Sequence, residues 1–124
     1  MYLDYAKASD SVVHNKLLYK LTCYGACDMI LVWLKDFLTG RSHTVRVGNC
    51  VSTLRTVISG VPQGSCLGPV LFVDFINDIV NCSNDAVSVK LFADDAKLYT
   101  VISNESSAAN LQSSLDYILS WSLV

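Results

Sequence analysis

Three aspartates stand where their carboxylates could act together. Asp94 and Asp95 are adjacent within the apolar stretch VSVKLFADDAKLYTVI, and Asp4 follows the N-terminal residues MYL. Burying one carboxylate is costly, and two neighbouring carboxylates also repel each other. The pair therefore either occupies an exposed hairpin turn or is neutralised by a bound cation.

Carboxylates at a strand end and at a hairpin tip would suit a hard cation. Mg²⁺ takes oxygen ligands and usually keeps one or two protein carboxylates per site. Two such ions roughly 3.5–4 Å apart can stabilise both oxygens of a phosphoryl displacement. The alternative is an ordinary solvated turn, because Asp is a common turn residue. We expect Asp10 to cap a helix, and Asp74 and Asp78 to share a solvated helix face.

The segment SGVPQGSCLGPV, residues 59–70, is the second conspicuous feature. It holds three of the six glycines and both prolines of the chain. Gly60 and Gly64 are not followed by Lys and Ser or Thr, which excludes a Walker A phosphate loop, and no G-x-S-x-G elbow is present. The segment predicts a shaped loop that leads into a helix, with Pro69 in the first helical turn.

The elements that must position these residues can be predicted from periodicity and turn signals. We expect a short strand at residues 1–5 and helices at 13–24, 28–40, about 69–80 and 105–121. Asp28 is the predicted cap of the second helix, and Ser103 or Asn104 that of the last. The last helix should bury one face made of four residues, Leu111, Leu115, Ile118 and Leu119. Two hairpins are predicted, one over 43–57 with its turn at Gly48-Asn49, and one around Asp94-Asp95. This order predicts an α+β fold with helices on one face of an antiparallel sheet.

Composition limits the class of protein. The chain has 124 residues, 52% of them hydrophobic and 16% charged, as expected for one modest domain with a core. Its net charge of −2 argues only weakly against nucleic-acid binding, because a basic groove needs only local clustering. Five irregularly spaced cysteines predict free thiols, mostly buried, and no structural zinc. Without a membrane-length apolar run or a signal peptide, we expect an intracellular protein of the cytoplasm or nucleus, neither secreted nor membrane-bound.

Three segments together resemble the palm motifs of reverse transcriptases. They are DYAKASDSVVHNKLLYKL, SGVPQGSCLGPVLFVDFIND and LFADDAKLY, and their order, spacing and flanking residues all fit. They are most similar to the motifs of non-LTR, LINE-type retrotransposons, and the resemblance covers residues 4–121. It implies a ferredoxin-like polymerase palm, an antiparallel sheet backed by helices. It also implies two-metal nucleotidyl transfer that extends a DNA primer on an RNA template with dNTP substrates.

The resemblance also implies roles for individual residues. Asp4, Asp94 and Asp95 would be the catalytic carboxylates that hold two Mg²⁺ ions, with Mn²⁺ as a substitute. The substrate-binding positions would be Gln63 and Gly64 in the loop, at the nucleotide and template, and Phe92 and Ala93 on the floor of the site near the primer end.

Ser9 departs from the family pattern. It stands where the family usually has an aromatic residue that packs beneath the sugar of the nucleotide and excludes a 2′-hydroxyl. Serine leaves space there, so the resemblance implies weak discrimination against ribonucleotides. A random lesion in a decaying copy is the alternative explanation.

The family's fingers and thumb have no counterpart in the sequence. We therefore expect residues 1–124 to be a partial reverse transcriptase domain with palm motifs only, inactive or feeble alone. Uncovered apolar palm surface should make the chain poorly soluble or self-associating. The side chains expected on that surface are Trp33, Phe37, Leu119 and Trp121. Two alternatives stay open: a palm remnant that binds nucleic acid or supports structure without catalysis, and an unrelated ferredoxin-like interaction domain. The following basic residues either contact backbone phosphates or are simply solvated: Lys7, Arg41, Arg46, Arg55, Lys90 and Lys97.

Overall fold

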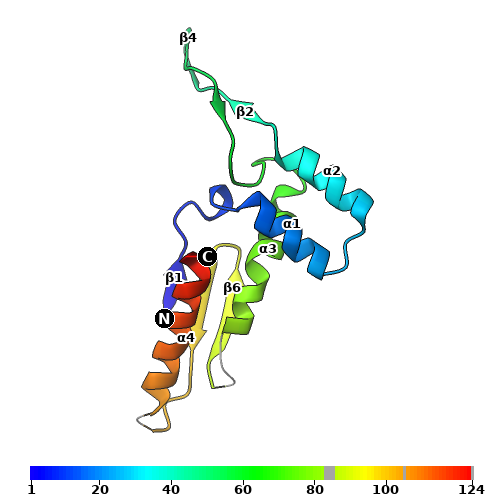
Figure 1. The fold of residues 1–124 in the computed structure, drawn as a ribbon. Coiled ribbons are helices and arrows are strands. Elements are labelled where there is room, and N and C mark those ends of the chain that lie inside the picture. The colour runs from blue at the N-terminus through cyan, green and yellow to red at the C-terminus, as the bar shows by residue number, and fades with distance from the viewer. Residues whose placement is uncertain (83–85, 105, 124) are drawn as a thin grey trace. The chain divides into compact units, whose positions relative to one another are not determined.

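The chain folds into two compact units (Figure 1). The computed structural model describes residues 1–82, 86–104 and 106–123. The sheet unit comprises Met1–Ala6 and Ile76–Val124, and the helical unit comprises Lys7–Phe75. Among the described residues, no helix combines the length and the apolar character that crossing a membrane requires.

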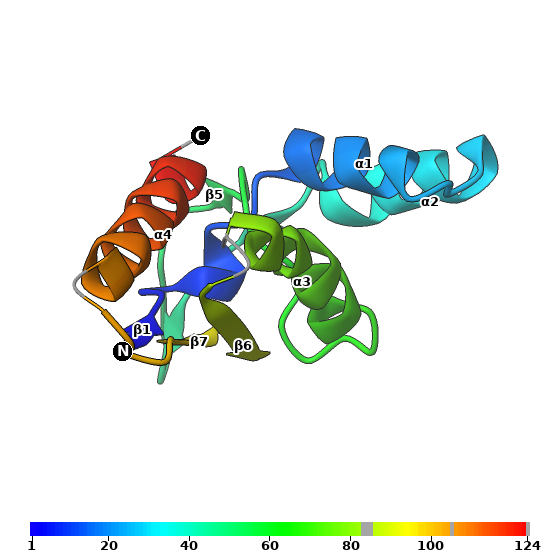
Figure 2. The ribbon, with the colours of Figure 1, turned by 90° about the horizontal axis from the view of Figure 1, so that it is seen from below.

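The sheet unit is an antiparallel three-stranded sheet with one covered face. Its strands are β1 (Tyr2–Asp4), β6 (Ser88–Phe92) and β7 (Asp95–Tyr99), in the order β1-β7-β6. A 3₁₀ segment, η2 (Asn77–Cys82), and helix α4 (Ser106–Leu123) complete the unit, and Figure 2 shows α4 on one side of the sheet. On β7, the fully buried Ala96 and Leu98 alternate with exposed neighbours. Period-two burial of this kind leaves the other face of the sheet open.

The helical unit contains helices, a long hairpin and a loop. A 3₁₀ turn, η1 (Ala8–Asp10), precedes α1 (His14–Cys23) and α2 (Asp28–Leu38), which pack against each other. Four short strands follow: β2 (Ser42–His43), β3 (Arg46–Val47), β4 (Cys50–Val51) and β5 (Arg55–Thr56). The unit ends at Phe75 within helix α3 (Gly68–Ile76), whose last residue is counted with the sheet unit. This element order agrees with the α+β prediction.

Three local predictions about helix ends were wrong. Asp28 is the first residue of α2 rather than its cap, and Cys27 occupies the cap position without a side-chain hydrogen bond. Asp10 lies in η1 and does not cap α1, whose cap position is Val13. Helix α3 ends at Ile76, where the chain tightens into η2. Helix ends fray, so capping patterns locate them only to within one or two residues.

The half-buried Asp78 is not on a solvated helix face. Its Oδ1 accepts a hydrogen bond of 3.1 Å from the indole Nε1 of Trp121 on α4. The edge-to-face contact between the rings of Trp121 and Tyr5, with centroids 6.3 Å apart, extends this cluster toward β1. Residues from three parts of the sequence therefore meet within the sheet unit.

The buried face of α4 differs from the predicted one. Ile118 is buried and Leu111 and Leu115 are half-buried, but Leu119 is 59% exposed. Ser107 and Ser114 are buried instead, at helical spacing from Ile118. The predicted start at Glu105 lies outside the described residues.

The cysteine prediction was right about the thiols and wrong about their burial. Cys23, Cys27, Cys50 and Cys66 are free, and all four are exposed. They lie at helix ends, in a hairpin and in a loop, where no packed core surrounds them. The side chain of Cys82 is outside the described part of the structure.

Candidate functional site

The register of the sheet brings two of the predicted carboxylates together. Asp4 at the end of β1 is the direct partner of Asp95 at the start of β7, and Phe92 at the end of β6 is the partner of Asp95 on its other side. Direct partners project to the same face, with Cβ atoms about 4.5–5.5 Å apart. All three side chains are exposed. They form an acidic row across the open face, defined here as Asp4, Asp95 and Phe92.

The next row on the open face is basic and aromatic. Tyr2 pairs with Lys97, which pairs with Lys90. The Lys97 ammonium lies 5.3 Å from the ring centroid of Tyr2 and 5.7 Å from that of Tyr99. Cation–π attraction at these distances holds the lysine over the rings. A carboxylate pair is thus bordered by ammonium groups on one exposed surface.

Asp94 lies in the turn that joins β6 to β7. The preceding residue, Ala93, has a φ of 51°, a left-handed conformation in which a Cβ is unfavourable. Such strain costs on the order of 1 kcal/mol and persists only where surrounding structure imposes it. Here the pairing of Phe92 with Asp95 closes a two-residue turn and imposes it. The turn fixes Asp94 directly beside the acidic row.

The donor chemistry of this edge fits a hard divalent cation. Like charges placed directly opposite each other across a sheet are destabilising, and a cation between them would relieve the repulsion. Within the described ranges, no group of three or more Asp, Glu, His or Cys side chains is arranged to hold a metal ion. A pair of carboxylates is still the protein contribution that Mg²⁺ commonly takes, with water and phosphate oxygens completing its shell. The Asp4–Asp95 pair matches that contribution.

The predicted loop residues and Ser9 lie in the helical unit, and the structure brings them near one another. The backbone carbonyl of Ser9 accepts a 3.0 Å bond from the Val61 N–H, within the loop that carries Gln63 and Gly64. Ser9 is half-buried, whereas Gln63 and Gly64 are exposed. Phe92 and Ala93 belong to the sheet unit with the three aspartates.

Gly60 shows why this loop has its shape. It has a φ of +87°, and an added Cβ would lie 2.9 Å from the Asp10 Cα and 3.0 Å from its carbonyl oxygen. The Gly60 N–H donates to the carbonyl of Val12 at 2.8 Å. Only glycine allows so close a backbone approach in this conformation. The loop is therefore fastened to the segment that carries Ser9.

His14 is a residue of this region that sequence reasoning missed. It is buried, and its Nε2 donates to the carbonyl of Gly60 at 2.8 Å, which requires a proton on that nitrogen. Arg41 donates to the same carbonyl at 3.3 Å. His14 thus supports the loop rather than binding a ligand. No spacing signal in the sequence links His14 with Gly60, 46 residues away.

Comparison with known proteins identifies the relatives of this chain. The family model described as reverse transcriptase (RNA-dependent DNA polymerase) matches residues 1–123. The chain is 33% identical to the RNA-directed DNA polymerase from mobile element jockey of Drosophila melanogaster, over 97% of this chain and 14% of that protein. It is 33% identical to the probable RNA-directed DNA polymerase from transposon BS of the same species, over 98% of this chain and 14% of the relative. A retrovirus-related Pol polyprotein from type-1 retrotransposable element R2 of Popillia japonica is 30% identical over 67% of the chain.

Proposed function

The chain belongs to the reverse transcriptase (RNA-dependent DNA polymerase) family, and we propose that it provides the catalytic carboxylates of an RNA-directed DNA polymerase of a non-LTR retrotransposon. The observation that carries the proposal is the cross-strand pair of Asp4 and Asp95, with Asp94 in the adjoining turn. The chain spans 14% of the length of the jockey and BS relatives. The activity of a whole polymerase is therefore proposed for a longer protein, and this chain alone is proposed to be inactive or feeble.

The proposed architecture is the ferredoxin-like palm of polymerases. An antiparallel sheet with one face covered and the other open supports it, because a palm must leave one surface for its substrates. The open face carries the carboxylates at one end and Lys90 and Lys97 in the next row. Positive groups beside the acidic row would help to attract the phosphates of a nucleic acid.

The proposed cofactor is Mg²⁺, two ions per site, with Mn²⁺ as a substitute. Asp4, Asp94 and Asp95 would hold them. When bound, divalent ions supply charge stabilisation for phosphoryl transfer, the chemistry by which a primer end is joined to a nucleotide. The chain itself contributes position: the ladder holds Asp4 against Asp95, and the strained turn holds Asp94. Position and charge are most of what phosphoryl transfer asks of a protein.

The substrate-binding roles of the other residues are proposed from the family. Phe92, 83% exposed, and Ala93 would line the floor of the site near the primer end. Gln63 and Gly64 would contact the nucleotide and the template, and Ser9 would lie beneath the sugar. RNA template, DNA primer and dNTP are the proposed partners.

Self-association of the isolated chain is also proposed. Of the four apolar side chains expected on uncovered surface, Trp33 is 55% exposed and Leu119 is 59% exposed, while Phe37 and Trp121 are half-buried. Met29 and Val32 extend the exposed apolar surface of α2 around Trp33, which stacks on Phe37 with centroids 5.7 Å apart. Apolar surface of this kind marks an interaction site. A concentration-dependent mass in sedimentation equilibrium would support it, and a monomer at all concentrations would contradict it.

The test of the proposed site is metal binding by the chain and its variants. Electron paramagnetic resonance of free Mn²⁺ should report binding that Asp4→Asn and Asp95→Asn each weaken by roughly tenfold, since each removes one of two paired ligands. Asp116→Asn is the matched control, because Asp116 is an exposed carboxylate on α4 of the same unit. Equal binding by all four proteins would refute the assignment.

A further inference from the structure

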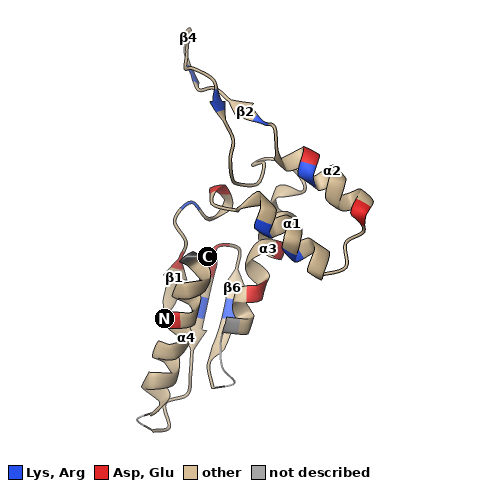
Figure 3. Cartoon of the chain, in the orientation of Figure 1, with Lys and Arg blue, Asp and Glu red and all other residues tan. Residues whose placement is uncertain are grey.

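The segment 41–58, called the hairpin arm here, has an unusual charge. It contains all three arginines of the chain, Arg41, Arg46 and Arg55, and no Asp or Glu occurs from residue 37 to residue 73. The arm therefore carries a formal charge of +3 in a chain whose net charge is −2. Figure 3 shows blue positions and no red ones along it. A local cluster of one sign can bind a polyanion whatever the net charge of the protein.

The arm is a two-stranded ribbon that stays in register through one bulge. His43 pairs with Arg55 at its base, and Arg46 pairs with Val51 nearer its tip. Between the two ladders the return strand holds one extra residue, as in a β-bulge, which increases the twist of the ribbon. Every residue from 42 to 56 is exposed. Within the described part of the helical unit, neither face of the ribbon is covered.

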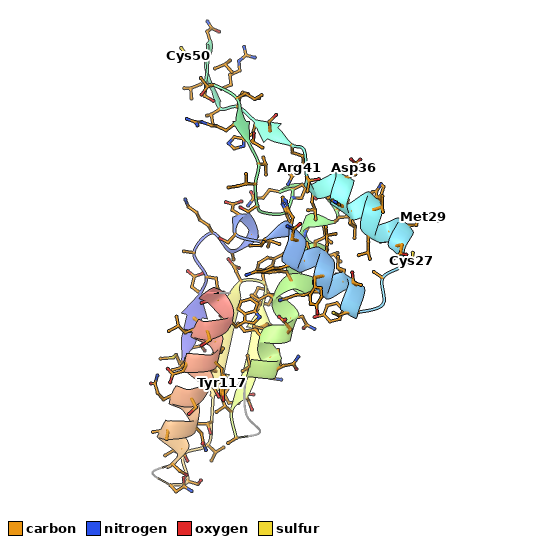
Figure 4. The ribbon with its side chains drawn as sticks, in the orientation of Figure 1. Cys27, Met29, Asp36, Arg41, Cys50 and Tyr117 are labelled. Carbon is orange, nitrogen blue, oxygen red and sulfur yellow. The ribbon has the colours of Figure 1, made fainter. Side chains whose placement is uncertain are left out.

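The three arginines make different contacts. Arg41 donates from Nε to the carbonyl of Leu38 at 2.9 Å and from Nη2 to that of Gly60, so it fastens the base of the arm. Figure 4 shows Arg41 at that base and Cys50 near the tip. Arg46 donates from Nε to the carbonyl of Gly48 in its own turn at 3.1 Å. The described structure gives the Arg46 Nη groups and the exposed Arg55 no carboxylate partner, so both remain open to a ligand.

The side chains of the arm select the kind of ligand. Guanidinium groups match phosphate oxygens with paired hydrogen bonds. No Phe, Tyr or Trp occurs from residue 38 to residue 71, so the arm offers no aromatic platform on which unpaired bases could stack. Exposed valines such as Val45 and Val47 would suit an apolar protein partner. Such a partner would not explain why the arm contains three arginines and no Asp or Glu.

We propose that the hairpin arm binds the phosphate backbone of a base-paired nucleic-acid duplex through Arg46 and Arg55. The choice of an RNA–DNA hybrid as that duplex rests on the proposed function, because a template and its primer are base-paired. The contact would be independent of sequence, since it reads the backbone and not the bases. It would position a duplex on the helical unit without any metal.

The experiment measures binding of the full chain to a fluorescent RNA–DNA hybrid by anisotropy, in EDTA and over a range of NaCl concentrations. The double variant Arg46→Gln/Arg55→Gln should lose roughly tenfold in affinity for each arginine at low salt. The slope of log K against log salt should fall in magnitude by about 1.8, or 0.9 for each phosphate contact. Lys16→Gln/Lys35→Gln, on α1 and α2, removes the same charge from the same unit and should change affinity less than about threefold.

Circular dichroism should show both double variants folded, because the substituted side chains are not in the core. An equal loss in the two variants, or an unchanged salt slope, would overturn the proposal. A third result would also overturn it: single-stranded RNA binds as tightly as the hybrid, and the Arg46→Gln/Arg55→Gln variant loses the same affinity for both. Because this measurement is made in EDTA, a negative result would not contradict the proposed metal site at Asp4 and Asp95. The Mn²⁺ measurement tests that site separately, without nucleic acid.

Discussion

The chain has two β-hairpins that solve the same geometric problem differently. In β6–β7 the turn places Ala93 at a φ of 51°, whereas in the hairpin arm the turn places Gly48 at a φ of 58°. A two-residue turn of this kind needs a positive φ, which glycine adopts freely and alanine does not. The first hairpin carries aspartates at its turn, and the second carries arginines along its strands.

Burial explains why only one hairpin tolerates strain. The β6–β7 pair buries Ala96 and Leu98 against the rest of the sheet unit, while the arm buries nothing from residue 42 to residue 56. Full burial of the Leu98 side chain contributes about 1.5–3 kcal/mol. This exceeds the strain of one turn and the repulsion of one carboxylate pair. A hairpin without a buried face lacks this stabilisation from burial, so nothing offsets such costs. We infer that the covered hairpin can hold an unfavourable site and that the arm cannot.

The largest expected effect tests that difference in burial. Leu98→Ala should lower the free energy of unfolding by about 3 kcal/mol, because a fully buried side chain leaves a cavity. Leu54→Ala in the arm, where the leucine is 68% exposed, should cost less than about 0.5 kcal/mol. Urea denaturation of both variants measures the difference. Similar losses would show that the arm is packed in solution.

The next effect concerns relief of repulsion at the acidic row. Mg²⁺ at about ten times its dissociation constant should stabilise the chain by about 1.4 kcal/mol, since it binds only the folded state. Asp95→Asn, which should bind the metal about tenfold more weakly, should reduce this gain to about 0.4 kcal/mol, and Asp116→Asn should keep it. Thermal unfolding with and without Mg²⁺ gives the measurement. Stabilisation of Asp95→Asn equal to that of the unsubstituted chain would argue that the metal binds elsewhere.

Substitutions at the two turn residues, Ala93→Gly and Gly48→Ala, should each change a free energy by about 1 kcal/mol. The first should change global unfolding and the second only local opening of the arm. Ala93→Gly should raise the free energy of global unfolding, because it removes strain from the cooperative sheet unit. Gly48→Ala should instead favour local opening of the arm, increasing hydrogen exchange at the Ser52 amide, bonded to Val45 at 2.8 Å, by about fivefold. Its global unfolding midpoint should not move. A shift in that midpoint would mean that the arm unfolds together with the core.

The smallest effect isolates the carboxylate pair itself. Without divalent metal, Asp95→Asn should stabilise the chain by a few tenths of a kcal/mol at low salt, because like charges no longer face each other. At 1 M NaCl the gain should vanish, since the Debye length there is only about 3 Å. Urea denaturation at the two salt concentrations provides the comparison. A gain that persists in 1 M NaCl would point to a cause other than charge.

Much of this architecture follows from local sequence. The spacing of apolar residues predicts α1 and α2, and Gly48-Asn49 marks the first hairpin turn. The second turn consists of Ala93 and Asp94, one residue before the Asp94-Asp95 pair around which the hairpin was predicted. Helix ends and the inner face of α4 were predicted less well. Asp78, for example, was expected in solvent but accepts a bond from Trp121, 43 residues later. Such a partner is invisible to a pattern that reads a few neighbouring residues.

By itself, the sequence determined the elements, the turn positions and the motifs that mark the reverse transcriptase family, since these depend on periods of two or 3.6 residues and on nearby turn chemistry. Tertiary structure decided which residues meet. Pairing of β1 with β7 sets Asp4 opposite Asp95, and a slip of one residue would send the two carboxylates to opposite faces. Close approach of Gly60 to Asp10 fastens the loop beside Ser9. Both depend on contacts between distant segments, which form only when the whole unit packs.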